Sequence, residues 1–348
     1  MAEVQTEQAV VNTENIAQEI LAHIERERER EIIARRFGLF DRKETLEQIG
    51  ELLNITRERV RQLEKSVLAR LQSSASEGEL PHVTELQTSL VNELTELGSV
   101  ARICDLSARL TSENSRTDQS RVAFLAKLCP QLVVIEDNDD YYQAVSIASV
   151  RDEKRIKADV TALVAAIKKV GEPTTIEEIA SSIHTDATQA QALASVSKSL
   201  ATLNGRWGLV KWSMVNPKNI RDKIYVVLKE HGKHMHFNEI AGAIKDSEFK
   251  RKDVTTQAIH NELIKDKRFV LIGRGIYALK EWGYQKGTVA DIITEVLREA
   301  GEPLHRDEIV KRVLKSRFVK ETTILLNLQG KTQFKRVAKA TYSLAESE

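Results

Sequence analysis

Cysteine is nearly absent from this sequence, because Cys104 and Cys129 are the only two among 348 residues. Two thiols are too few for a disulfide scaffold or for a zinc site built from cysteines. No apolar run approaches the ~20 residues that cross a bilayer, and the N-terminus has neither a basic nor an apolar region typical of a signal peptide. We therefore expect a cytoplasmic protein without a membrane segment.

Sequence motifs of catalysis and cofactor binding are also lacking. No Walker, Gly-x-Ser-x-Gly or His-Glu-x-x-His pattern occurs, and Gly273 to Gly275 is predicted to be a turn. His231, His234 and His236 lie close together, but no acidic or cysteine partner has ligand spacing. The acidic run Glu136 to Asp140 lacks the glycine and the closing glutamate of a calcium loop. We predict no enzyme activity, metal, cofactor or small-molecule ligand.

Charge is segregated along the chain, although the net charge is only +1. Residues 77–150 carry 5 basic and 12 acidic side chains, a balance of −7. Residues 219–348 carry 25 basic and 18 acidic side chains, a balance of +7. Such asymmetry indicates modules with different partners. We expect the C-terminal half to contact nucleic acid and the acidic module not to.

Residues 45–71, TLEQIGELLNITRERVRQLEKSVLARL, have the pattern of two short helices around a tight turn. Thr45 can cap the first helix, and Gln48 three residues later completes a capping box. Gly50 is small where the two helices would cross closely. Asn54 can adopt the left-handed conformation that a sharp turn needs. The pattern predicts a helix-turn-helix.

The second of these helices, which Thr56 can cap, separates its faces. Its apolar residues recur at helical spacing and predict a buried stripe of Val60, Leu63, Val67 and Leu71. The opposite stripe consists of Arg57, Glu58, Arg61, Gln62 and Lys65. Arginine can fork onto guanine, glutamine can pair with adenine, and glutamate can accept from cytosine. The alternative is a solvated face with internal charge pairs, but the combination favours a DNA-reading helix.

The segment REREREIIARRFGLFDRKETLEQIGELLNITRERVRQLEKSVLARL, residues 25–71 with the helix that precedes the turn, resembles the last conserved region of the housekeeping bacterial sigma factor family. TRERVRQLE and RRFGL carry the resemblance most specifically. It implies reading of a promoter −35 element in double-stranded DNA and docking on the β flap of core RNA polymerase. It places Arg57, Glu58, Arg61 and Gln62 at DNA bases, and Arg36, Thr45 and Leu46 at the DNA backbone. We also expect Lys65, from the exposed stripe, to contact the backbone. Asn54 departs from the glycine usual in the family.

Elements repeat along the rest of the chain. We expect a flexible tail at 1–15, one helix from Ile16 through Arg36, and a linker at 73–82 after the module at 16–72. Four copies then follow, each with a helix that ends near a glycine, a short strand, two helices and two strands. This is the order of a winged helix. The predicted copies are residues 83–150 (acidic), 151–216, 217–284 and 285–348.

The third copy carries a second resemblance. The phrase RFVLIGRGIYALKEW and the helices before it are similar to the HARE winged-helix family, which includes the δ subunit of Gram-positive RNA polymerase. The resemblance implies a role in transcription. Basic side chains of this copy are candidates for the phosphate backbone, with a solvated surface as the alternative: Arg274 and Lys280 at the wing, and Lys250, Arg251 and Lys252 before the third helix.

The sequence thus predicts a mainly α protein, a helix-turn-helix followed by four winged helices with small β-hairpins. The leading hypothesis is a DNA-binding transcription protein at RNA polymerase. The chain contains no aromatic-rich segment of the kind that reads a −10 element, so we expect a split or accessory sigma-like regulator and not a self-sufficient sigma factor. One alternative is a polymerase-anchored interaction scaffold. Another is the DNA-binding subunit of a nuclease or modification complex.

Overall fold

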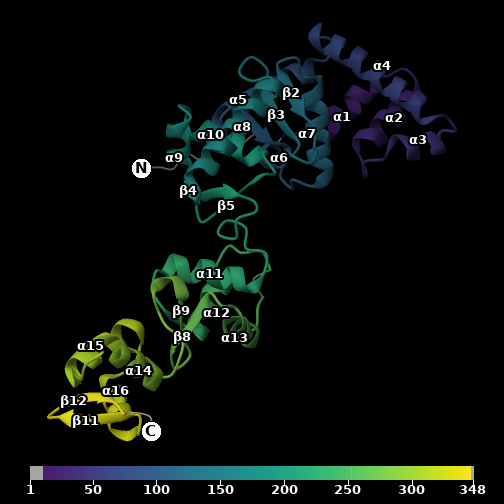
Figure 1. Ribbon diagram of the computed structural model, residues 1–348. Helices are drawn as coiled ribbons and strands as arrows, with labels where there is room; N and C mark the ends of the chain where they lie inside the picture. The colour runs from purple at the N-terminus through teal and green to yellow at the C-terminus, as the bar shows by residue number, and fades with distance from the viewer. Residues whose placement is uncertain (1–10, 252, 346–348) are drawn as a thin grey trace, which may run out of the picture. The chain divides into compact units, whose positions relative to one another are not determined.

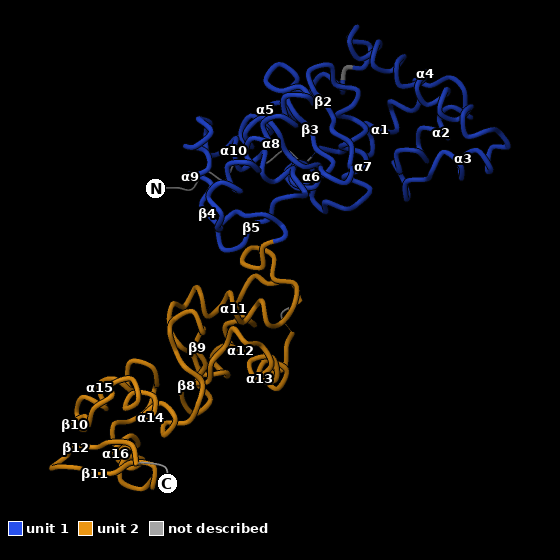
Figure 2. Tube along the Cα trace, in the orientation of Figure 1, with its two compact units in different colours: residues 1–211 blue, residues 212–348 orange. Residues whose placement is uncertain are grey.

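The computed structural model of the protein describes residues 11–251 and 253–345. Over these residues the chain forms sixteen α-helices and four antiparallel sheets of three strands each (Figure 1). The prediction of a mainly helical protein with small β-hairpins is confirmed. The chain divides into two compact units, Met1–Lys211 and Trp212–Glu348 (Figure 2). Among the helices described, none is long and apolar enough to span a membrane.

Four helices form the N-terminal part of the first unit: α1 (Thr13–Ala22), α2 (Glu27–Phe37), α3 (Leu46–Leu52) and α4 (Arg57–Ser76). The tail expected at 1–15 is wrong for its last residues, because Asn12 caps α1 and the Thr13 side chain is buried. Residues 1–10 lie outside the described part of the chain.

The single helix expected from Ile16 through Arg36 is interrupted at residues 23–26. In one straight helix, Ile20 and Ile24 would lie opposite Ile33 and Phe37, since a helix turns once every 3.6 residues. The interruption lets both pairs face the same core, where all four side chains are buried.

The rest of the first unit contains two repeats of one element order, helix, strand, helix, helix and two strands. The first repeat comprises α5 (Pro81–Glu96), β1 (Val100–Arg102), α6 (Ile103–Leu110), α7 (Arg116–Leu128), β2 (Leu132–Ile135) and β3 (Ala144–Ile147). The second comprises α8 (Glu153–Val170), β4 (Thr174–Thr175), α9 (Ile176–Ser182), α10 (Ala187–Val196), β5 (Leu200–Leu203) and β6 (Arg206–Leu209).

The second unit contains two more repeats of the same order. The third comprises α11 (Ile220–His231), β7 (Met235–His236), α12 (Phe237–Asp246), α13 (Thr256–Lys265), β8 (Phe269–Gly273), β9 (Ile276–Leu279) and the short 3-10 helix η1 (Lys280–Trp282). The fourth comprises α14 (Val289–Ala300), β10 (Leu304–His305), α15 (Arg306–Ser316), α16 (Glu321–Gly330), β11 (Phe334–Ala338) and β12 (Thr341–Leu344).

The three strands of each repeat form a separate sheet. The last strand pairs with both the first strand and its hairpin partner, in the orders β1-β3-β2, β4-β6-β5, β7-β9-β8 and β10-β12-β11. The hairpin predicted around Gly273 to Gly275 is present as β8 and β9, with a register shift between Leu271 and Gly273. β2, β5, β8 and β11 are therefore edge strands.

The N-terminal helices and the first repeat share one hydrophobic core. Val67 and Leu71 of α4 are buried in the same cluster as Phe124 of α7. The linker predicted at 73–82 is consequently wrong for most of its length. α4 continues through Ser76 because Ala75 is buried in this core, and α5 already begins at Pro81.

Candidate nucleic-acid interface

The turn between α3 and α4 is held by local hydrogen bonds that the sequence predicts. The Thr45 hydroxyl accepts from the Gln48 amide at 3.2 Å, and the Gln48 side-chain oxygen accepts from the Thr45 amide at 2.9 Å. Asn54 has φ +53°, the left-handed conformation expected of it. Thr56 caps α4 by accepting from the Arg59 amide at 3.2 Å. These contacts fix where α4 starts relative to α3.

Gly50 allows the two helices to approach closely. A Cβ atom at this position would lie 2.7 Å from the Ile55 carbonyl oxygen, closer than a real Cβ contact. Ile49 and Val60 then pack with Ile32 of α2 in a small core beneath the turn. The prediction that a small residue is needed at Gly50 is confirmed.

The two faces of α4 are as predicted. On the inner face, Val60, Val67 and Leu71 are buried and Leu63 is half-buried. On the outer face all five predicted side chains are exposed: Arg57, Glu58, Arg61, Gln62 and Lys65. The face that could enter a DNA groove is thus presented by a helix whose other side is anchored in two hydrophobic cores.

Within the outer face, Arg61 is paired with Glu58. Its Nε and Nη2 atoms donate to the two carboxylate oxygens at 2.8 and 2.6 Å. The hydrogen bonds lower the pKa of Glu58 and raise the pKa of Arg61, so both side chains are charged at neutral pH. Arg59 is also exposed and donates to Gln62 at 3.3 Å. Arg59 lies beside the predicted stripe but was not among the predicted DNA contacts.

The predicted backbone-contact residues have different surroundings. Arg36 forms an ion pair with Glu64 of α4 at 3.3 Å and donates to the Glu44 carbonyl oxygen, so it already ties α2 to α4. Thr45 is exposed beside its capping bonds, and Leu46 is half-buried. Lys65 is exposed on the same face of α4 as Arg61.

The C-terminal half of α4 is braced by the first repeat. The Gln72 side chain donates to the Lys127 carbonyl oxygen of α7 at 2.9 Å. The buried Arg121 of α7 donates to the Leu39 carbonyl oxygen at 2.7 Å and pairs with Glu14 of α1 at 2.8 Å. The Gln72 bond and the shared core thus hold the C-terminal half of α4 on α7, while the Arg121 contacts join α7 to α1 and to the segment after α2.

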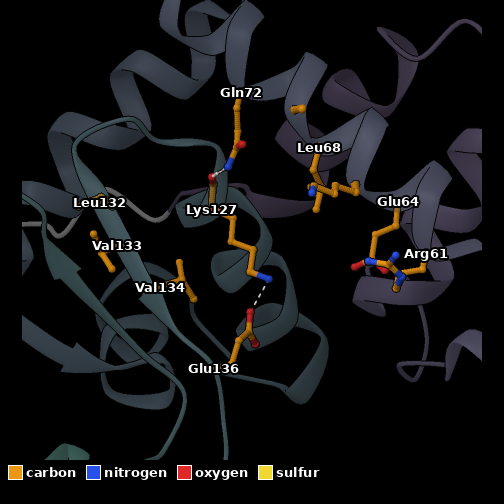
Figure 3. Close-up of a pocket in the computed structure, with 11 residues that line it drawn as sticks. Arg61, Glu64, Leu68, Gln72, Lys127, Leu132, Val133, Val134 and Glu136 are labelled. Carbon is orange, nitrogen blue, oxygen red and sulfur yellow. Dashed lines mark hydrogen bonds and ion pairs between the residues drawn. The ribbon is translucent and has the colours of Figure 1, made fainter. Parts of the chain in front are cut away.

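A groove of about 670 Å³ runs between α4 and the edge strand β2. Arg61, Lys65 and Leu68 line one side, and Val134, Lys127 and Glu136 line the other. Figure 3 shows Lys127 directed toward Glu136, on the opposite side of the opening from Arg61 and Glu64. The groove leaves the exposed face of α4 accessible beside the first repeat.

The candidates in the third repeat do not form a comparable site. Arg274 is exposed in the turn between β8 and β9, and Lys280 is exposed at the start of η1. The carbonyl oxygens of Lys250 and Arg251 both accept from Lys223 Nζ at 2.7 Å, which holds their loop against α11. Lys252 lies outside the described residues.

The histidine cluster and the acidic loop make contacts within the protein. His236 caps α12 by accepting from the Asn238 amide, and the His234 ring packs at a tilt against Phe318 with ring centroids 4.5 Å apart. In the acidic loop, Lys198 donates to the Asn138 carbonyl oxygen at 2.6 Å and pairs with Asp137 at 3.0 Å.

Comparison with known proteins covers the helix-turn-helix and its preceding helix. Residues 26–73 match the family described as Sigma-70, region 4. Over 49 residues the chain is 55% identical to RNA polymerase sigma factor RpoD of Helicobacter pylori. The matched segment is 14% of this chain and 7% of that protein. Over 46 residues it is 52% identical to RNA polymerase sigma factor SigA1 of Synechococcus elongatus. That segment is 13% of this chain and 12% of the relative. Residues 26–73 are therefore a Sigma-70 region 4 module, within a chain that matches these relatives over about a tenth of their length.

Proposed function

We propose that the protein is a sequence-specific DNA-binding protein of transcription initiation that reads a −35-like element with α4. The observation that carries the proposal is the exposed face of α4, where Arg57, Glu58, Arg61 and Gln62 stand together on a Sigma-70 region 4 module. These side chains offer donors and acceptors suited to base edges in the major groove. Thr45, Leu46, Arg36 and Lys65 would contact the flanking backbone.

The same module would dock on core RNA polymerase at the β flap. This part of the proposal rests on the resemblance of residues 25–71 to the sigma factor region that has that role. The chain would then act as an accessory regulator at promoters. A pull-down of polymerase β by the full-length protein tests it.

The four repeats are proposed to be winged helices, and the third to be of the HARE type. The repeated order of helix, strand, two helices and a hairpin, with the first strand added to each sheet, supports this assignment. In such a fold the third helix is the one placed to enter a DNA groove.

The first repeat is unsuited to DNA reading. Seven residues of its third helix α7 are buried, including Phe124 and Arg121, because the helix packs against α1, α2 and α4. The segment from residue 77 to 150 also has a balance of −7. We infer that this repeat braces the reading helix, and its acidic surface favours protein contacts, which keeps a scaffold role as the second candidate function.

Binding to two matched duplexes tests the proposal. The full-length protein is titrated with a duplex that contains a TTGACA-like element and with a scrambled duplex, each at several salt concentrations. The proposal predicts preference for the first duplex and affinity that falls steeply with salt, since phosphate contacts release counterions. Equal, weak binding to both, with polymerase β still captured, would favour the scaffold.

A further inference from the structure

The hairpin of the fourth repeat projects from the protein body. On β11, Phe334 is buried, whereas every residue from Lys335 to Lys339 is exposed. Successive side chains of a strand point to opposite faces, so both faces of this strand are open. Tyr342 on β12 is buried and, with Phe334, anchors the base of the hairpin in the core of the fourth repeat.

The corresponding hairpin strands of the other three repeats are more covered. β2 and β5 are buried at both ends, and β8 is buried at three of its five positions. The outer edge of β8 is also occupied, because the Phe318 amide donates to the Ile272 carbonyl oxygen at 3.1 Å and Arg317 donates to the Leu271 carbonyl oxygen. Of these four edge strands, β11 is the most exposed.

The projecting hairpin is strongly basic. Residues 330–344 contain Lys331, Lys335, Arg336 and Lys339 and no acidic residue. All four are exposed, and within residues 253–345 none has a carboxylate oxygen within ion-pair distance. The Arg336 Nε atom donates to the Ala338 carbonyl oxygen at 3.2 Å, which keeps the guanidinium beside the tip.

Protection of a sheet edge does not account for these charges. Lysine on an edge strand prevents pairing with other chains. However, β2 and β5 are hairpin edge strands with no lysine or arginine within their bounds, so an edge strand at this place in the repeat does not require one. Edge protection would also not require charges on both faces and at the tip.

We propose that the β11–β12 hairpin is a second contact for duplex DNA, made to the phosphate backbone without regard to sequence. A two-stranded ribbon fits the major groove of B-form DNA, whereas the major groove of A-form RNA is too narrow. Lys335 and Arg336 point to opposite faces of the ribbon, so charges can meet phosphates on both sides of a groove. The contact does not depend on base reading by α4.

Salt-dependent binding of the full-length protein tests this contact. The variant is Lys335→Gln, Arg336→Gln, Lys339→Gln, and the control is Arg298→Gln, Lys311→Gln, Lys315→Gln. The control removes the same charge from exposed positions on α14 and α15 of the same repeat. Each lost phosphate contact should reduce the slope of log K against log salt by about 0.9. We expect the hairpin variant to lose about 2 to 3 from that slope and the control to keep it.

The outcomes separate this contact from base reading by α4. The hairpin variant should weaken binding to TTGACA-like and scrambled duplexes alike, by about tenfold or more at moderate salt. Arg61→Ala should weaken only the former. A hairpin variant that binds as the control does overturns the proposal. Greater loss on duplex RNA than on DNA of equal length also overturns it.

A second measurement uses the parent protein and does not depend on the variant folding. Acetylation of lysines is compared with and without scrambled duplex DNA. Lys335 and Lys339 should be protected several-fold, while Lys311 and Lys315 react equally in both samples. Equal reactivity of all four lysines contradicts the contact.

Discussion

Glu58 and Arg61 form a two-point ion pair on the exposed face of α4, one turn apart, with hydrogen bonds of 2.8 and 2.6 Å. Both belong to the proposed base-reading set. In the free protein the pair orients the guanidinium, and on DNA the same groups would exchange this contact for base edges. The ion pair therefore holds the Arg61 guanidinium in a defined orientation, and breaking the pair costs part of the free energy of DNA binding.

Arg61→Ala should cost about 1–3 kcal/mol of binding to the preferred duplex and relax specificity at one base pair. The physical reason is loss of the forked donor that suits guanine. Binding to a set of duplexes with single base changes measures the effect. Arg61→Lys is the matched control, because it keeps the charge without the fork. Arg61→Lys should bind scrambled DNA as the parent does, but it should lose the discrimination between duplexes that differ at the one base pair. Unchanged discrimination in both variants would show that Arg61 does not read a base.

The shared core predicts that α4 and the first repeat unfold together. Phe124 is fully buried, and its ring packs on Phe37 with centroids 5.1 Å apart. Phe124→Ala should cost about 3–5 kcal/mol of stability in the first unit. Hydrogen exchange should then accelerate in α4 as well as in α7. Phe334→Ala, in the core of the fourth repeat, is the control and should leave α4 unchanged. Normal exchange in α4 after Phe124→Ala would mean that the modules are independent.

Gly50 and Gly242 form a matched pair, since both lie within helices but only Gly50 has a close neighbour. Gly50→Ala places a methyl group 2.7 Å from the Ile55 carbonyl oxygen, so the turn must shift. We expect a loss of about 1–3 kcal/mol in stability and weaker DNA binding. No atom lies within 4 Å of a Cβ at Gly242, so Gly242→Ala should stabilise by about 0.5–1 kcal/mol. Thermal unfolding measures the stability of both variants. If Gly50→Ala is as stable as Gly242→Ala, or more stable, the close crossing of α3 and α4 is contradicted.

Cys129 should be chemically inert in the folded protein. Burial raises its pKa to about 12, so very little thiolate is present at pH 8. Iodoacetamide should label Cys129 far more slowly in the native protein than in denaturant, where the pKa returns to about 8.5. The rate of native labelling should rise with pH beyond pH 8, since the folded thiol is still largely protonated there. Fast labelling of native Cys129 at pH 8 would contradict its burial. Peptide mass spectrometry separates it from Cys104.

Local features of the site were predictable from sequence, whereas the packing partners were not. The capping box of Thr45 and Gln48 and the left-handed Asn54 depend on residues within one turn of each other. The apolar stripe of α4 predicts that Val67 is buried but does not identify its neighbour. Val67 packs in a core that is shared with α7. Burial of Ala75 in the same core extends α4 into the expected linker. The exposed β11 was missed because alternation within FKRVA does not reveal that the hairpin projects.

A selection from random duplex DNA tests the central claim most directly. The full-length protein is used, because α1, α2 and α4 share a core with the first repeat and should not be expected to fold without it. It is compared with the Arg57→Ala, Arg61→Ala variant at moderate salt. The account predicts that the parent enriches a TTGACA-like motif and that the variant does not. No motif with the parent, or the same motif with both proteins, would contradict base reading by α4.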